Sequence, residues 1–413
     1  MRYECRCRNR GSIYLFVLAS SLIITIIGMG SLFAVRVQSR SARTAEAATH
    51  VRLCAQSALE LGLLMVTQDP NWRTTQANGH WLSGTSLGDA TLSLEGIDPL
   101  DGDLTDNEYE PLVLTGTGQK GLARYKTQVT LVANVKALEA LNTCVHAKKR
   151  LHVHLGNQLT ASGAPASTNE DLDNDGTITG DVHADTVTAA GTITGELTEG
   201  AVQKRLPDAA VITDYLSKAT TVPFTGDIDK QLLTPAYNPW GAENADGVYF
   251  IDTGDQDLTI KDSRIHGTLI VDVGNKKLFL TESLLLHAYR SDYPVLIVIG
   301  KLNIELKSGD IPLSETDLGV NFNPPGVPYL GQMDDDTDDD YPNEIQGLIH
   351  VTKKLTLKET ARIVGAIICE DKVDGHGDNV IVHDPGLYAS PPVGYTYVDG
   401  MKVSPGSYQR VVD

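Results

Sequence analysis

The sequence predicts an α+β fold: a long membrane-spanning N-terminal helix, a small β-sheet domain after it, and then a mainly-β parallel β-helix, or solenoid. Three observations predict it. An uncharged apolar run fills residues 12–35, the chain holds 38 glycines with only 6% aromatic residues, and short strand-like segments recur after residue 145. Abundant glycine and β-branched residues with few aromatics are typical of a β-rich chain with many turns.

The N-terminal helix is predicted over residues 12–68. The 24 residues from Ser12 to Val35 carry no charge. They would form a helix of about 36 Å, which exceeds the roughly 30 Å hydrocarbon core of a bilayer. An ordinary secretory signal has a shorter apolar run. From Arg36 to Gln68 the chain has no proline and a single glycine, Gly62, so we expect the helix to continue outside the membrane.

The second half of this helix carries a stripe of small and apolar residues at spacings of three and four. Such a stripe predicts one helical face. Small residues on that face allow a second helix to approach closely. The members of the stripe are Ala45, Ala48, Ala55, Ala58, Leu59, Gly62, Leu63 and Val66.

The N-terminus resembles that of PilX-like minor pilins and, more broadly, of type IV pilin-like (pseudopilin) proteins. The resemblance lies in Arg10-Gly11-Ser12, the unbroken apolar run, the arginine-rich exit and the alanine-rich extension. It implies that residues 1–11 are a prepilin-type leader, which prepilin peptidase would cut between Gly11 and Ser12. The apolar helix would then pack against other pilin or pseudopilin subunits.

Two positions depart from the pattern of major pilins. The fifth residue after the predicted cut is Phe16 where major pilins carry Glu, and the first mature residue would be Ser12. A minor or tip subunit fits these departures better than a major one. The competing interpretation is an uncleaved signal anchor without any filament. The large acidic region behind the helix favours an inner-membrane anchor with an exported domain, displayed at the cell surface or in a pilus or pseudopilus.

Residues 69–144 are predicted to form a small β domain of the kind that pilins pack on the exposed half of their helix. Asp69-Pro70 marks the turn that ends the helix. Residues 109–135 predict a hairpin, because a glycine-containing turn joins two alternating apolar runs.

Residues 145–392 are predicted to form the solenoid, because segments there repeat. GTITGDV at 176–182 recurs as GTITGEL at 191–197, and residues 257–271 match residues 354–369 with one insertion. Stacked repeats bury their apolar faces against one another. This region, including HDPGLYASPP at 383–392, also resembles β-solenoid regions attached to PilX-like N-termini. A Greek-key sandwich is the competing β fold. Residues 207–219 predict a short helix, and residues 393–413 a loose tail.

One acidic segment fits the first half of a calcium loop. Asp171, Asp173 and Asp175 occupy positions 1, 3 and 5, Gly176 follows, and Thr177 and Thr179 stand at positions 7 and 9. Position 12 is Val182 where a bidentate Glu is required, so the loop is incomplete. The alternative is a solvated acidic turn.

Other candidate sites carry weaker signals. His152 and His154 alternate on one strand face and could reach one metal, but no third ligand is evident. Arg264 and Arg362 fall at equivalent positions of two repeats and predict a structural ladder. The sequence does not decide whether Cys144 and Cys369 form a disulfide. The two remaining candidates are the acidic clusters Asp334–Asp336 and Asp338–Asp340, and the loop histidines His376 and His383.

Composition narrows the function. A formal net charge of −19 disfavours nucleic-acid binding, which requires a basic surface. No P-loop and no H-E-x-x-H motif is present. The sequence therefore predicts a non-enzymatic structural or assembly component of a type IV pilus or type II secretion-like pseudopilus, with calcium as its one candidate cofactor. The alternative is a membrane-anchored carbohydrate-binding or polysaccharide-active β-helix protein.

Overall fold

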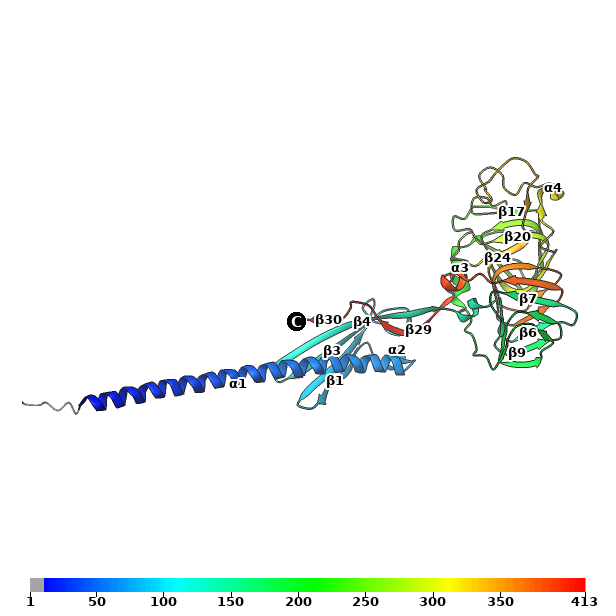
Figure 1. The fold of residues 1–413 in the computed structure, drawn as a ribbon. Coiled ribbons are helices and arrows are strands. Elements are labelled where there is room, and N and C mark those ends of the chain that lie inside the picture. The colour runs from blue at the N-terminus through cyan, green and yellow to red at the C-terminus, as the bar shows by residue number, and fades with distance from the viewer. Residues whose placement is uncertain (1–10, 413) are drawn as a thin grey trace, which may run out of the picture. The chain divides into compact units, whose positions relative to one another are not determined.

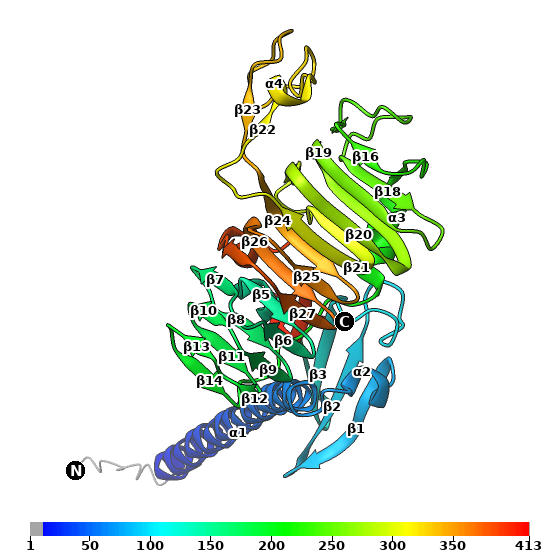
Figure 2. The ribbon, with the colours of Figure 1, turned by 90° about the vertical axis from the view of Figure 1, so that its right-hand side faces the viewer.

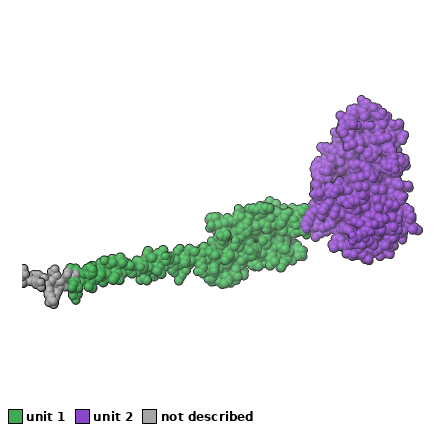
Figure 3. Space-filling model, in the orientation of Figure 1, with its two compact units in different colours: residues 1–135, 398–413 green, residues 136–397 purple. Residues whose placement is uncertain are grey.

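The computed structural model describes residues 11–412 and divides the chain into two compact units (Figure 3). Unit 1 comprises Met1–Val135 together with Val398–Asp413, and unit 2 comprises Lys136–Tyr397. Of the predicted leader, residues 1–10 lie outside the described residues. The second unit is thus inserted into the first one along the chain.

Unit 1 begins with the helix α1, Gly11–Gln68, which has 58 residues and confirms the predicted long helix (Figure 1). At 1.5 Å per residue its length is about 87 Å. The helix ends where predicted, because Pro70 lacks the N–H that would continue it. The Asn71 N–H donates to the Asp69 carboxylate at 2.8 Å, and the short helix α2, Trp72–Thr75, follows.

An antiparallel sheet packs on the second half of α1. Its strands run in the order β1-β2-β3-β4, and β3 and β4 form the predicted hairpin, in which Gly116 lies opposite Thr127. Their bounds are β1 Gly79–Leu87, β2 Ala90–Ile97, β3 Leu112–Lys120 and β4 Ala123–Ala137. Leu92, Leu94 and Leu114 point from the sheet into a core shared with the helix.

The predicted loose tail at 393–413 is wrong. The chain returns to unit 1, where β29, Thr396–Val403, and β30, Gln409–Val411, both pair with β4. The Asn134 amide also donates to the Asp399 carbonyl at 3.3 Å. Residues 393–413 lack the repeats found upstream, because these strands belong to a different sheet.

Unit 2 is built on a sheet of 22 strands. Its pairings run parallel, which excludes the antiparallel Greek-key sandwich. The short N-terminal strands are β5 Val145–Ala147, β6 Arg150–Val153, β7 Gln158–Ser162, β8 Ala166–Thr168, β9 Asp171–Asn174, β10 Thr177–Thr179, β11 Val182–Ala184, β12 Thr186–Ala189, β13 Thr192–Ile193 and β14 Leu197–Glu199. The later strands are β15 Thr220–Thr221, β16 Ile228–Asp229, β17 Leu232–Leu233, β18 Val248–Asp252, β19 Leu258–His266, β20 Thr268–His287, β21 Leu296–Leu306, β24 Glu344–Val351, β25 Leu355–Leu357, β26 Arg362–Cys369, β27 Lys372–Gly375 and β28 Asp378–Val382.

The sequence repeats lie directly on one another. Ile178 of the first GTITG segment pairs with Ile193 of the second. In the longer repeat, one buried column runs across neighbouring strands through Ile260, Leu280, Ile304 and Leu357. In three of these strands, the residue two positions after the column residue is acidic and has a positive φ: Asp262, Glu282 and Glu359. The repeated pattern therefore encodes both the buried column and the corner after it.

The order of the strands in space differs from their order in the chain. The last strands, β26–β28, pair on one side with β24 and β25 and on the other with β5–β7. Figure 2 shows these orange strands between the green N-terminal strands and the yellow-green strands β18–β21. For example, Ile367 pairs with both Ile349 and Val145. The C-terminal strands of unit 2 thus lie between the strands that precede them in the chain and the N-terminal strands of the unit, and they join both into one sheet.

Two further layers cover the sheet. The predicted helix at 207–219 is present as α3, Ala210–Lys218, and packs with η1, Glu139–Asn142, and α5, Gly386–Ala389, against one sheet face. A long excursion after β21 carries β22 Leu313–Ser314, α4 Glu315–Leu318 and β23 Asp340–Tyr341. Its Phe322 and Tyr341 pack against Leu232 and Leu285.

The cysteines of the described residues are all free, so Cys144 and Cys369 do not form a disulfide. Both thiols are fully buried, and each is 3.4 Å or less from two backbone carbonyl oxygens. Burial raises the pKa of Cys144 to about 11 and that of Cys369 to about 12. They behave as small apolar core residues.

Candidate functional site

The first half of α1 exposes apolar side chains on every side. The segment Ile13–Gln68 contains a stretch that is long and apolar enough to cross a membrane. None of the residues in that stretch is buried. Exposed members include Phe16, Ile24, Met29 and Phe33, each at least 68% exposed. A water-soluble protein rarely shows so large a continuous apolar surface, which marks an interaction with lipid or protein.

Four hydroxyl groups of this half bond to the backbone of the helix itself. The hydroxyl groups of Ser20 and Ser21 donate to the carbonyl oxygens of Val17 and Leu18, and those of Thr25 and Ser31 donate four residues back. A hydroxyl that bonds to its own backbone adds no unsatisfied polar group in an apolar environment. These four hydroxyl groups therefore do not oppose the placement of this stretch in hydrocarbon.

The second half of α1 is covered by the sheet of unit 1. Val51, Ala55, Ala58 and Leu59 are at most 2% exposed. The close approach depends on Gly116 of β3, where a Cβ atom would lie 2.2 Å from the Ala55 carbonyl oxygen. The helix thus changes its surroundings near residue 50.

The predicted small-residue stripe is one helical face, but its partner differs from the one expected. Ala55, Ala58 and Gly62 face β2 and β3 of the same chain, since Gly62 lies against the side chains of Leu94 and Leu114. Ala45 and Ala48 stay exposed. From residue 51 onwards the small residues therefore pack against the sheet of the same chain. Only the part of the stripe before residue 51 is exposed and available to a second helix.

The predicted processing residues lie at the start of α1. Gly11 is its first residue and Ser12 its second. Phe16, which stands where major pilins carry Glu, is 77% exposed. Cleavage between Gly11 and Ser12 stays a prediction.

The predicted calcium residues are spread over two strands. Asp171 and Asp173 lie on β9, where alternate residues of one face are about 7 Å apart. The Asp171 carboxylate accepts a hydrogen bond of 2.6 Å from the Thr188 hydroxyl, whereas Asp173 and Asp175 lie near His152. Thr177 and Thr179 lie on β10, and the Thr179 hydroxyl accepts a hydrogen bond from Gln158. Only Asp173 and Asp175 are brought together, and calcium at these five residues stays a prediction.

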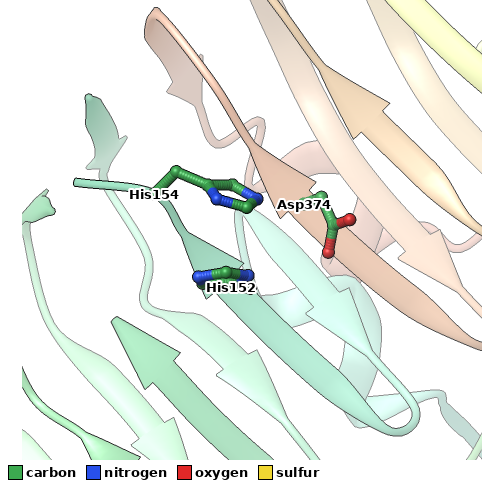
Figure 4. Close-up of side chains that lie close together, drawn as sticks. All are labelled: His152, His154 and Asp374. Carbon is green, nitrogen blue, oxygen red and sulfur yellow. The ribbon is translucent and has the colours of Figure 1, made fainter. Parts of the chain in front are cut away.

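His152 and His154 do acquire a third neighbour. Asp374 of β27 pairs in register with His152 of β6, and one ligand atom from each of His152, His154 and Asp374 lies within 4.8 Å of the others (Figure 4). No sequence signal connects Asp374 with the histidines, because the pairing of β27 with β6 joins segments more than 200 residues apart.

Two features weaken this group as a metal centre. Asp374 already forms ion pairs with Lys354 and Arg150. The His154 ring lies face to face with that of His376, with centroids 3.8 Å apart, and lies at the same centroid distance from the His152 ring, tilted by 40°. Imidazoles bind metals in the plane of the ring, and rings that lie one above the other do not direct their nitrogens at a common ion. Loss of surrounding water lowers the pKa of His154 and His376, which favours a stack of neutral rings.

The remaining predicted positions have separate partners. Arg264 pairs with Leu285, which pairs with Glu344, the partner of Arg362 in an ion pair. However, buried Arg264 donates to the carbonyl oxygens of Phe322 and Pro328, whereas Arg362 pairs with Glu344, so the predicted ladder is not formed between them.

The other acidic and histidine candidates are also held locally. The Asn323 amide donates to the carboxylates of Asp334 and Asp339, which ties the two acidic clusters together. Loop residue His383 is buried and bonds to the Leu141 carbonyl oxygen at 2.9 Å. These contacts account for both groups as parts of the fold.

The chain contains one match to the G-x-S-x-G pattern of α/β-hydrolases, at residues 84–88. The catalytic serine of that pattern sits on a sharp turn from a strand into a helix. Ser86 instead lies within β1 and pairs with Thr91 of β2, in an antiparallel hairpin. The match therefore lacks the structural context of a nucleophile.

No protein-family model matches the chain, and no curated protein matches it. Among solved structures, the competence-associated pilin ComZ from Thermus thermophilus matches 88% of this chain and 98% of its own, with 9% identity and a TM-score of 0.29. An ice-binding protein from an Antarctic biological consortium matches 59% of this chain and 88% of its own, with 13% identity and a TM-score of 0.24. The ice-binding protein LeIBP from Arctic yeast matches 58% and 90%, with 10% identity and a TM-score of 0.24. At these TM-scores and identities the similarities carry no weight.

A further acidic group, with no recognisable motif in the sequence, lies on the loop between β2 and β3. One carboxylate oxygen from each of Asp98, Asp101 and Glu110 lies within 4.8 Å of the others. The available signal was the density of acidic residues in DPLDGDLTDNEYE at 98–110. This group is separate from the apolar surface of α1.

Proposed function

We propose that this protein is a minor pilin-like or pseudopilin-like subunit, whose α1 anchors it in a membrane or filament and whose unit 2 is displayed outside. The observation that carries the proposal is the change along one continuous helix. Its first half is bare and apolar on every side, and its second half is covered by an antiparallel sheet.

Lengths support this division. Residues 13–37 contain the exposed apolar side chains and span about 37 Å of helix, enough for the roughly 30 Å hydrocarbon core. The whole helix is more than twice that thickness, so its second half lies beyond the bilayer. Arg36, Arg40 and Arg43 stand at the junction, are exposed, and suit the headgroup region.

The resemblance of the N-terminus supplies the finer part of the proposal. Prepilin peptidase cuts between Gly11 and Ser12, and the bare half of α1 then packs laterally against the helices of other pilin or pseudopilin subunits. Unit 2 acts as a rigid parallel β-solenoid, for adhesion or assembly, at the surface of an inner-membrane-anchored pilus or pseudopilus. Its role involves no catalytic turnover.

N-terminal processing tests the proposal directly. The full chain is expressed in a host with a prepilin peptidase, recovered from the envelope fraction, and its N-terminus is determined by mass spectrometry. We expect the mature chain to begin at Ser12, and Gly11→Val to block the cut. Asn9→Ala, two residues upstream, is the matched control and should be processed normally. An intact Met1 in the wild-type envelope protein would instead identify an uncleaved signal anchor.

Retention in the membrane tests the role of the bare surface. Ile24→Lys places a charge at the centre of the apolar half, where a lysine is expected to disfavour insertion by about 2.5–3.5 kcal/mol. Gln38→Lys, just beyond the apolar stretch, adds the same charge as a control. We expect carbonate extraction to release the first variant more readily than the second. Equal retention of the two would contradict the proposed placement.

A further inference from the structure

The loop between β2 and β3 in unit 1 concentrates negative charge in a fixed shape. Residues 98–110 include six acidic side chains: Asp98, Asp101, Asp103, Asp106, Glu108 and Glu110. The loop has no helix or strand of its own. Long irregular loops in compact domains are commonly functional. Carboxylates gathered in this way repel one another unless a cation or hydrogen bonds compensate their charge.

The backbone of the loop is held by two residues. Leu104 is 3% exposed and inserts into the core beneath the sheet. The Arg73 guanidinium donates to three loop carbonyl oxygens, those of Leu104, Glu108 and Glu110. These contacts fix the path of the chain. The guanidinium bonds are made to backbone carbonyl oxygens and not to the carboxylates.

Asp98 lies at the base of the loop and has one unused oxygen. Its backbone N–H donates to Asn78, and its Oδ1 accepts a hydrogen bond of 2.8 Å from the Leu100 N–H. Its Oδ2 has no hydrogen-bond partner and is buried, since the residue is only 3% exposed. A buried carboxylate oxygen without a partner is strongly unfavourable, so a missing cation is the natural complement.

The neighbouring carboxylates surround the same point. One oxygen each from Asp98, Asp101 and Glu110 lies within 4.8 Å of the others. Oxygens that bind Ca²⁺ at about 2.4 Å can be at most about 4.8 Å apart across the ion, so the three fit one coordination shell. Glu110 Oε2 is likewise buried without a partner.

We propose that Asp98, Asp101 and Glu110, with water in the remaining positions, form a Ca²⁺ site that fixes the β2–β3 loop of unit 1. The oxygen-only ligand set suits a hard cation, and several carboxylates on an irregular loop suit Ca²⁺ better than Mg²⁺, which demands strict octahedral geometry and retains its water. The site is independent of the assembly role proposed above.

Calcium titration of the whole protein tests the site. Full-length protein in detergent is stripped with EGTA, and CaCl₂ is titrated into it by calorimetry. We expect saturable binding with a dissociation constant of about 10⁻³ M or tighter, the range of extracellular calcium modules. Asp98→Asn and Asp101→Asn should each weaken binding at least tenfold. Absence of saturable binding to the wild type would overturn the proposal.

Two control variants locate the site. Asp335→Asn/Asp336→Asn removes two charges from the other acidic cluster, and Asp171→Asn/Asp173→Asn/Asp175→Asn removes those of the calcium loop predicted from sequence. Both should leave the saturable Ca²⁺ binding unchanged. Loss of this binding in the second control, with its retention in Asp98→Asn, would overturn the assignment. Equal affinity for Mg²⁺ would also overturn it.

A second measurement separates binding from folding. Asp101 is exposed, so Asp101→Asn should fold normally and show the same circular dichroism as the wild type. In the wild type, Ca²⁺ should slow amide hydrogen exchange across residues 98–111 and leave unit 2 unchanged. The same slowing in Asp101→Asn would refute a role of this carboxylate in the site.

Discussion

Gly116 and Gly118 set how closely the sheet of unit 1 approaches α1, and Gly118→Ala is the sharpest test of that packing. A Cβ atom at residue 118 would lie 2.0 Å from the Val51 carbonyl oxygen. The obstructing atom belongs to helix backbone and cannot rotate away. The added methyl group therefore forces β3 away from α1 by about 1 Å or more, since contact distances in cores are about 3.5–4.0 Å.

The displacement has a predictable magnitude. Overpacking a core typically destabilises by about 1–3 kcal/mol, and a backbone obstruction belongs at the upper end of that range. A loss of about 3 kcal/mol corresponds to roughly a hundredfold faster opening, because each 1.4 kcal/mol is a factor of ten. Leu92, Leu94 and Leu114 would lose contact with the helix at the same time.

Hydrogen exchange measured by mass spectrometry resolves the effect by segment. In Gly118→Ala, exchange should accelerate about a hundredfold in residues 51–66 and 112–120 and stay unchanged in residues 345–369 of unit 2. Thr117→Ala is the matched control, because Thr117 points away from α1 on the other face of β3. Equal protection in the two variants would refute the argument that these glycines admit the helix.

Three further predictions concern unit 2. Ile304→Ala empties part of the fully buried column and should lower the free energy of unfolding by about 2–5 kcal/mol in a urea titration; a loss below about 1 kcal/mol would contradict the packing. Burial lowers the pKa of His146 to about 3, whereas an unfolded histidine titrates near 6.5. The unfolded state therefore binds more protons between these values, and His146 alone should lower the free energy of unfolding by about 2 kcal/mol from pH 7.5 to pH 5; urea titrations of His146→Gln should lack that component. In a Cys5→Ser/Cys7→Ser protein, Cys144 and Cys369 should react with a thiol reagent at pH 8 only after unfolding, because burial raises both pKa values; rapid labelling of the folded chain would contradict this.

The sequence predicted the features that depend on neighbouring residues. The uncharged run before Arg36 and the absence of proline up to Pro70 determine α1. The spacing of Ile178 and Ile193 reveals which residues pair in the parallel sheet. In both cases the periodicity of apolar residues is the direct cause of the structure, because it decides which face is buried.

Features that depend on distant pairing could not be predicted. Nothing in the tail predicts that Gln409 pairs with Gln128, or that Asp374 lies beside His152. The stripe of α1 was correctly recognised as a face, but composition alone does not distinguish a second helix from a sheet with Gly116 and Gly118 as its partner. The β2–β3 loop was missed because Asp98, Asp101 and Glu110 have no regular spacing, and only the folded path brings their oxygens together.

The return of the chain to β4 has a consequence for biosynthesis. Unit 1 obtains its edge strands, and unit 2 the strands that join its two halves, only from the final part of the polypeptide. A ribosome must therefore finish nearly the whole message before either unit can mature. A prematurely terminated product would keep α1 yet expose unpaired strand edges in both units, and such edges favour aggregation and proteolysis.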